Sequence, residues 1–225
     1  EAGAEVCIID INPKTPEVAK EFCDRGFTCH SVIANLGDAE SLKNGFEDAV
    51  KSLGGHLDII VNGAGVQKRH PSEEFPYEDW EFVLNINLNA VFRLCQLAGK
   101  QFMAQGSKGK IINIASMLSF FGGFTVPAYA ASKGGVAQLT KALCNEWAGK
   151  GINVNALAPG YMDTEMNTAL TDPSNPRFKE ITDRIPAHVW GTPEDMKGPC
   201  VFLASAASDY LNGAIIPVDG GYLVK

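Results

Sequence analysis

Short apolar runs alternate with longer amphipathic stretches along the whole chain. The apolar runs, such as EVCIID at 5–10, are short and bounded by turn residues, which is typical of buried strands. The amphipathic stretches repeat their apolar positions every three to four residues, as surface helices do. The pattern predicts strands at 5–10, 27–33, 57–62, 110–115, 152–158 and 214–218, and helical segments at 16–25, 39–53, 76–105, 129–150 and 193–204.

This alternation indicates an α/β fold. Strands that are apolar on both faces belong to parallel sheets covered by helices on both sides, so a doubly wound, Rossmann-like sheet is expected. The length of 225 residues, without repeats or linkers, fits one domain over 1–225. Within it, the polar, proline-containing part of 161–192 predicts an insertion that covers a substrate site.

The first residues depart from the usual order of such folds, which open with a strand, a glycine-rich turn and a helix. Residues 1–4 look like the end of a helix, and 5–10 like the second strand. We therefore expect that a strand–turn–helix unit of about 30 residues is missing ahead of Glu1. The alternative is a natural chain without this unit, which would be a non-catalytic oligomeric or binding protein.

Composition and charge exclude several classes of protein. The formal net charge of -7 and the pI near 5.1 leave no basic footprint for nucleic acid. No apolar run is long enough to span a membrane, and no signal peptide is visible. The six cysteines have no metal-ligand spacing, so no metal site is expected. They are expected to be buried free thiols, which favours a reducing, cytoplasmic location.

Three residues form a candidate catalytic group. Tyr129 and Lys133 are four residues apart on a predicted helix and therefore share a face. A neighbouring ammonium lowers the pKa of a phenol, which could then take a proton from an alcohol. Ser116 follows the strand at 110–115, at the edge where open α/β sheets place their sites. Taken alone, each residue could equally be an ordinary helix-surface or capping residue.

Together these residues resemble the short-chain dehydrogenase/reductase family. The resemblance runs from Glu5 to the last strand and includes NGAG at 62–65, NINL at 85–88, NVNALAPG at 153–160 and VDGG at 218–221. It implies a nucleotide-binding and catalytic domain that transfers a hydride between a nicotinamide and a CH–OH group. Tyr129 would be the acid/base, Lys133 would lower its pKa, Ser116 would orient the substrate oxygen, and Asn87 would hold a relay water.

The resemblance also implies a cofactor surface. Asp10 ends the second family strand, where a carboxylate binds ribose hydroxyls and repels a 2′-phosphate, so NAD is favoured and NADP is possible. Two positions depart from the family: Gly63 replaces an Asn, and Asn35 replaces an Asp. The expected cofactor contacts are Asp10, Asn35, Leu36, Asn62, Gly63, Ala64, Tyr129, Lys133, Pro159, Gly160, Met162 and Thr164.

Further segments resemble the sugar-acid branch of the family, the 2-deoxy-D-gluconate 3-dehydrogenases and gluconate 5-dehydrogenases. The segments are 160–170, 184–187, 190–191 and 207–213, together with Gln67-x-Arg69-x-Pro71. A hydroxy acid needs a cation for its carboxylate, and Arg69 is the candidate, with Gln67 and Asn167 helping around Ser116 and Tyr129. An exposed loop arginine without a role is an equal alternative, and a 3-oxoacyl thioester, a sugar or a polyol remain alternative substrates.

Self-association is the expected partnership. Family members usually form tetramers through the helices that correspond to 92–105 and 136–148. Both stretches here have apolar faces that are wide for one buried stripe, which favours a homotetramer or a homodimer.

Overall fold

A computed structural model describes residues 2–172 and 174–225. Every predicted strand is present, with ends that differ from the expected ones by at most two residues. The strands are β1 Val6–Asp10, β2 Cys29–Ile33, β3 Ile59–Asn62, β4 Gly109–Ile114, β5 Ile152–Pro159 and β6 Ile215–Val218. The helices are α1 Thr15–Asp24, α2 Ala39–Ser52, α3 Tyr77–Leu84, α4 Ala90–Gln105, α5 Pro127–Trp147, α6 Thr168–Thr171, α7 Pro176–Arg184 and α8 Lys197–Ala204.

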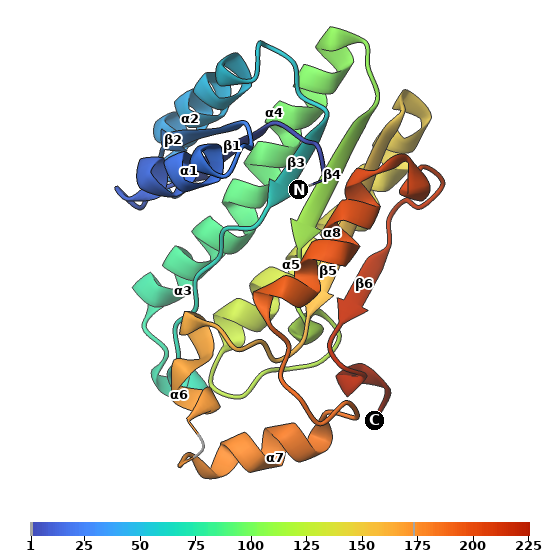
Figure 1. Cartoon of the computed structure of the whole chain (residues 1–225). Coiled ribbons are helices and arrows are strands. Elements are labelled where there is room, and N and C mark those ends of the chain that lie inside the picture. Colours follow the sequence, from blue (N-terminus) through green and yellow to red (C-terminus); the bar gives the residue numbers. More distant parts are fainter. Residues whose placement is uncertain (1, 173) are drawn as a thin grey trace.

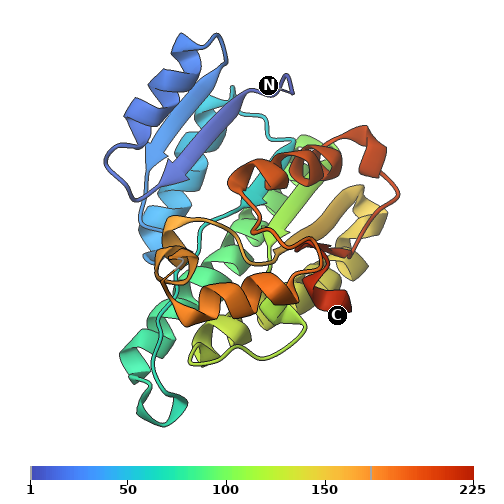
Figure 2. The ribbon, with the colours of Figure 1, turned by 60° about the horizontal axis from the view of Figure 1, so that its bottom comes forward.

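All strand pairs are parallel, as predicted, but the strands form two sheets rather than one. β1 pairs with β2, and β3, β4, β5 and β6 pair in that order. The β1–β2 pair lies to one side of the four-stranded sheet in both views (Figures 1 and 2). Within the described residues β1 and β3 therefore each have one edge without a strand partner.

The four-stranded sheet has a helical layer on each face. Ile111 and Val154 pack against α4 and α5, whereas the alternate positions Ile112 and Leu157 pack against Leu203 of α8. All four sheet residues are buried. This two-sided burial is the physical reason that the strands read as continuous apolar runs.

The segment predicted to be helical over 76–105 contains an interruption. A π-helical turn, Asn85–Asn89, separates α3 from α4. Such turns shift the register of a helix and are frequent at functional sites.

Most of the wide apolar face of α4 is buried by other elements of the same chain. Val91, Leu94, Cys95, Ala98 and Phe102 are buried in the core that α4 forms with α2, α5 and the sheet. Phe92, in contrast, has 45% of its surface exposed. Self-association through this helix stays a prediction, with Phe92 as its most exposed large apolar residue on the predicted stretch.

The cysteines agree with the expectation in one respect and differ in another. All six are free, but only Cys95 is fully buried, and Cys23 is exposed. None of the helices that the structure describes is long and apolar enough to cross a membrane.

Candidate functional site

Ser116 lies directly after β4 in an extended conformation, and its hydroxyl has two uses. Its Oγ accepts a hydrogen bond from the Leu118 N–H at 3.1 Å and so caps the short helical turn at Met117–Ser119. It also lies near the phenol of Tyr129: burial raises the pKa of that phenol, and the interaction with Ser116 partly offsets this rise. The capping and the catalytic interpretations of Ser116 are therefore compatible.

Tyr129 and Lys133 share a face of α5, as the spacing predicted. The Lys133 Nζ lies 5.6 Å from the centre of the Tyr129 ring and donates to the Ile114 carbonyl at 2.6 Å. The next turn of backbone is held as well, because the Ser119 hydroxyl donates to the Lys133 carbonyl at 2.6 Å. The amine and the carbonyl of Lys133 thus connect α5 to the end of β4 and to the turn after it.

Burial dominates the electrostatics of this pair. The side chain of Lys133 is only 3% exposed, and this desolvation lowers its pKa from 10.5 to about 8. Burial also raises the pKa of Tyr129, more than the Ser116 hydrogen bond lowers it. The expected lowering of the Tyr129 pKa by Lys133 is therefore not seen in the chain without bound ligands.

Asn87 is fully buried in the π-helical turn and faces the same place. Its Oδ1 accepts from the Val66 N–H at 2.8 Å, and its Nδ2 donates to the Val66 carbonyl at 2.9 Å and to the Ser132 hydroxyl at 3.2 Å. The π turn aims this amide at the segment after β3, which it clamps beside α5. The relay water expected at Asn87 stays a prediction.

A cavity of about 240 Å³ opens beside these residues. All five residues predicted to bind substrate line it: Ser116, Tyr129, Gln67, Arg69 and Asn167. The Arg69 Nη1 donates to the Phe124 carbonyl and the Thr125 hydroxyl, both at 3.1 Å. These bonds hold the guanidinium at the rim of the cavity, where Arg69 is exposed, and its binding role stays a prediction.

Helix α7 adds charged residues to this cavity that the sequence interpretation missed. Arg177, Glu180 and Arg184 line it from one face of the helix. Their helical spacing, and the Asn175–Pro176 start signal before them, could have identified this face. The segment was predicted only as an insertion because its polar composition hides the short helix.

The predicted cofactor residues lie at the carboxyl ends of the strands. Asp10 and Asn35 are exposed after β1 and β2, and Gly63 and Ala64 are exposed after β3. Pro159 and Gly160 end β5, where Gly160 approaches Asp219 so closely that an added Cβ would lie 2.6 Å from the Asp219 Cα. Thr164 follows half-buried, whereas Leu36 packs against the core.

Two predicted cofactor residues use their side chains inside the protein. Asn62 Nδ2 donates to Asn113 Oδ1 at 2.8 Å and to the Cys95 sulfur at 3.3 Å, while its own Oδ1 is buried without a partner in the described structure. The Met162 side chain packs on Gly191. Only the backbone beside these residues can face a cofactor, and the Met162 carbonyl already accepts from Asn167 at 2.9 Å.

These residues fit the two ends of a dinucleotide. Asp10 and Asn35 offer polar groups for an adenosine, and Lys133 and Tyr129 offer a buried amine and a phenol at the other end. A helix N-terminus that could hold the pyrophosphate between β1 and β3 is not among the described residues. Among the described residues, the fit therefore concerns the two ends of the dinucleotide.

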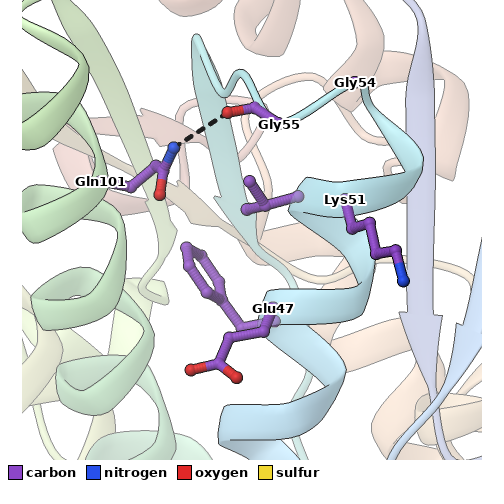
Figure 3. Close-up of a pocket in the computed structure, with 7 residues that line it drawn as sticks. Glu47, Lys51, Gly54, Gly55 and Gln101 are labelled. Carbon is purple, nitrogen blue, oxygen red and sulfur yellow. Dashed lines mark hydrogen bonds between the residues drawn. The ribbon is translucent and has the colours of Figure 1, made fainter.

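A larger hollow of about 580 Å³ lies between α2 and α4 (Figure 3). Gln101 closes one side by donating to the Gly55 carbonyl at 3.1 Å, while the Lys51 side chain points away from it. None of the predicted site residues lines this hollow. In the described parts of the chain, no group of His, Cys, Asp and Glu could hold a metal ion. The smaller cavity is therefore the candidate active site.

Comparisons with known proteins identify a family for the whole chain. The family profile described as Enoyl-(Acyl carrier protein) reductase matches residues 1–223. The chain is 48% identical to the 2-dehydro-3-deoxy-D-gluconate 5-dehydrogenase of Escherichia coli (strain K12), over 100% of this chain and 88% of that protein.

Two solved structures are similar throughout. One, from Beutenbergia cavernae with bound NADP, has a TM-score of 0.93 and 46% identity and covers 99% of this chain and 88% of that one. The other is a gluconate 5-dehydrogenase from Burkholderia cenocepacia J2315 in complex with NADP and tartrate. Its TM-score is 0.93 at 38% identity, covering 99% of this chain and 87% of that one.

The lowered pKa of Lys133 predicts that this residue costs stability. Below about pH 8 the folded chain must keep a buried charge, and this penalty disappears as the pH rises from about 8 towards 10.5. We expect Lys133→Met to raise Tm at pH 7 by about 4 °C. The difference from the unsubstituted chain should shrink above pH 8 in a calorimetric pH series.

Lys141→Met is the matched control, since Lys141 is exposed on the same helix. It should change Tm little and without this pH dependence. A Lys133→Met chain that is less stable than the unsubstituted chain at pH 7 would contradict the penalty.

Proposed function

Because the chain belongs to the short-chain dehydrogenase/reductase family, we propose that it interconverts a secondary alcohol of a sugar acid and the corresponding ketone, with a nicotinamide cofactor accepting or supplying the hydride. The observation that supports this most is one cavity lined by Ser116, Tyr129 and the anchored guanidinium of Arg69. The similar enzymes are named for position 5 of gluconate-type acids. We propose the same carbon for this chain.

The chain's own groups supply the proton chemistry. Ser116 and Tyr129 line the same cavity and interact with each other, so both hydroxyls are available to one substrate oxygen. In oxidation Tyr129 takes the hydroxyl proton, and in reduction it returns a proton to the carbonyl oxygen. The bound nicotinamide supplies or accepts the hydride. A protonated Lys133 would stabilise the phenolate form of Tyr129. Because burial lowers the pKa of Lys133 to about 8, the protonation of this amine changes near that pH.

Arg69 gives the cavity its preference for acids. Its guanidinium is held at the rim by Phe124 and Thr125, which reduces the conformational freedom that binding an anion would otherwise remove. Gln67 adds an amide that can bind substrate hydroxyls. The Asn167 amide also lines the cavity, but its Nδ2 already donates a hydrogen bond to the Met162 carbonyl. This arrangement suits a polyhydroxy carboxylate better than a neutral polyol.

We propose NAD as the preferred cofactor. Asp10 is exposed at the end of β1, and its carboxylate accepts a hydrogen bond from the nearby Asn12 N–H at 2.9 Å. A carboxylate there suits a ribose diol and repels a 2′-phosphate. Two of the similar structures hold NADP, so each activity assay should be run with NAD and with NADP.

We further propose that another parallel strand belongs between β1 and β3 in the natural protein. The two unpaired edges support this, since exposed edges of a parallel sheet are normally paired or covered. A glycine-rich turn after such a strand would place a helix N-terminus at the carboxyl ends of β1 and β3. That is the position where the pyrophosphate needs backbone N–H groups.

The proposed reaction is tested with gluconate, 2-deoxygluconate, their keto forms and a neutral polyol, each with NAD and NADP. We expect turnover of a sugar acid, with kcat lowered about 100-fold to 10,000-fold by Tyr129→Phe. Tyr210→Phe makes the same change at an exposed site and should have no effect. Activity confined to neutral ketones would overturn the sugar-acid assignment.

Replacing Arg69 tests the acid preference directly. Arg69→Ala should raise KM for the sugar acid about 10-fold or more, because a charge-assisted contact is lost, and leave NADH affinity unchanged. Lys68→Ala is the control, since Lys68 is the adjacent cation but pairs with Asp79 at 3.3 Å. An unchanged KM in Arg69→Ala shows that Arg69 does not bind the acid.

Hydrogen exchange tests the proposed strand. In the 225-residue chain, amides on the open edges of β1 and β3 should exchange faster than those of β5, which has a strand on each side. In the protein as translated from its natural gene, the same edges should be protected. Equal exchange in both forms would rule out the strand.

A further inference from the structure

Helix α7 presents one charged face to the cavity and one to solvent. Ile181 is only 4% exposed and packs in an apolar cluster with Met117 and Tyr222, which anchors the helix. Positions three to four residues from Ile181 share its face, so Arg177 and Arg184 lie towards the cavity. Lys179 and Asp183 form an ion pair on the outer face, with both side chains largely exposed.

Arg177 is close enough to Arg69 to affect its ionisation. Burial is the larger cause, and the charge of Arg177 the second, of a lowered pKa for Arg69. Among residues 2–172 and 174–225, no carboxylate lies within 4.0 Å of either guanidinium. Two neighbouring cations without a counter-ion repel each other, and an anion between them relieves that repulsion.

Arg184 is in a different situation. Its guanidinium carbon lies 4.3 Å from the centre of the Tyr222 ring and 5.9 Å from that of Phe121, so it is stacked on the aromatic wall. Seven residues separate it from Arg177, which places the two Cα atoms about 10 Å apart along the helix. The cavity therefore has a cationic end at Arg69 and Arg177 and an aromatic end at Arg184.

We propose that Arg177 and Arg69 form a two-guanidinium subsite that binds the substrate carboxylate. Two planar forks can satisfy both oxygens of one carboxylate, which a single anchored arginine that also holds Phe124 and Thr125 does less completely. The proposal rests on the sugar-acid function above. It adds that a residue of the 161–192 segment helps to hold the carboxylate end of the substrate.

Glu180 supports this orientation. It is the single carboxylate among the residues that line the cavity, and it lies one turn after Arg177 on the same face. A carboxylate accepts hydrogen bonds from hydroxyls and repels a second anionic group. The subsite thus suits an acid group at Arg69 and Arg177, followed by hydroxyl-bearing carbons along α7.

The test compares Arg177→Gln and Arg177→Lys with Lys179→Gln, which removes a positive charge from the outer face of the same helix. KM for the sugar acid should rise about 10- to 100-fold in Arg177→Gln, and less in Arg177→Lys. The kcat value, the NADH affinity and the KM for a neutral polyol should stay within about twofold. Calorimetric titration with gluconate should show the same loss of affinity without turnover, and Lys179→Gln should match the unsubstituted chain.

The possible failures can be told apart. If the unsubstituted enzyme uses sugar acids and Arg177→Gln leaves both their KM and the gluconate affinity unchanged, the subsite is wrong and the proposed function stands. If Arg177→Gln and Lys179→Gln weaken gluconate equally, the effect is long-range charge and the subsite is again wrong. If the unsubstituted enzyme uses only neutral ketones, the proposed function fails and the subsite with it.

Discussion

The buried amine of Lys133 is the constraint around which the site is built. An ammonium in the interior is costly unless its hydrogen bonds are satisfied, and here it donates to the Ile114 carbonyl at the end of β4. That bond requires α5 to sit against the carboxyl end of the sheet. Ser119, which donates to the Lys133 carbonyl, then fixes the turn that carries Ser116. The hydroxyls of Ser116 and Tyr129, the proposed catalytic groups, are thus positioned by interactions of the lysine as much as by their own.

Most elements could be predicted because their signals are local. The apolar runs, the spacing of Tyr129 and Lys133, and the position of Ser116 after a strand depend on neighbours in sequence. The split between β1–β2 and β3–β6 could not be predicted in this way, since strand pairing depends on contacts distant in sequence. Asn62 illustrates a second limit: its side chain could serve a cofactor or the core, and only packing against Cys95 and Asn113 decides.

The proposed site residues are distributed over the two sheets. Ser116, Tyr129, Lys133 and Asn87 belong to the four-stranded sheet and its helices, whose strands pair continuously. Asp10 and Asn35 belong to β1 and β2, which the core joins to the rest through the packing of α2 on α4. The residues proposed for proton transfer and substrate binding therefore lie in a continuously paired part of the fold. The residues proposed for the adenosine end of the cofactor lie on the β1–β2 pair.

The charge distribution explains how an acidic protein can select an acidic substrate. The chain carries a net charge of -7, which repels anions weakly at a distance. At physiological ionic strength such interactions are screened beyond about 8 Å, so a substrate near the cavity responds mainly to the groups that line it. Those groups are three arginines and one glutamate, a local excess of positive charge. This excess lies at the rim and wall of the cavity, where Arg69 and Arg184 are exposed and Arg177 is half-buried, so the proposed selectivity for the acid depends on direct contacts with these groups.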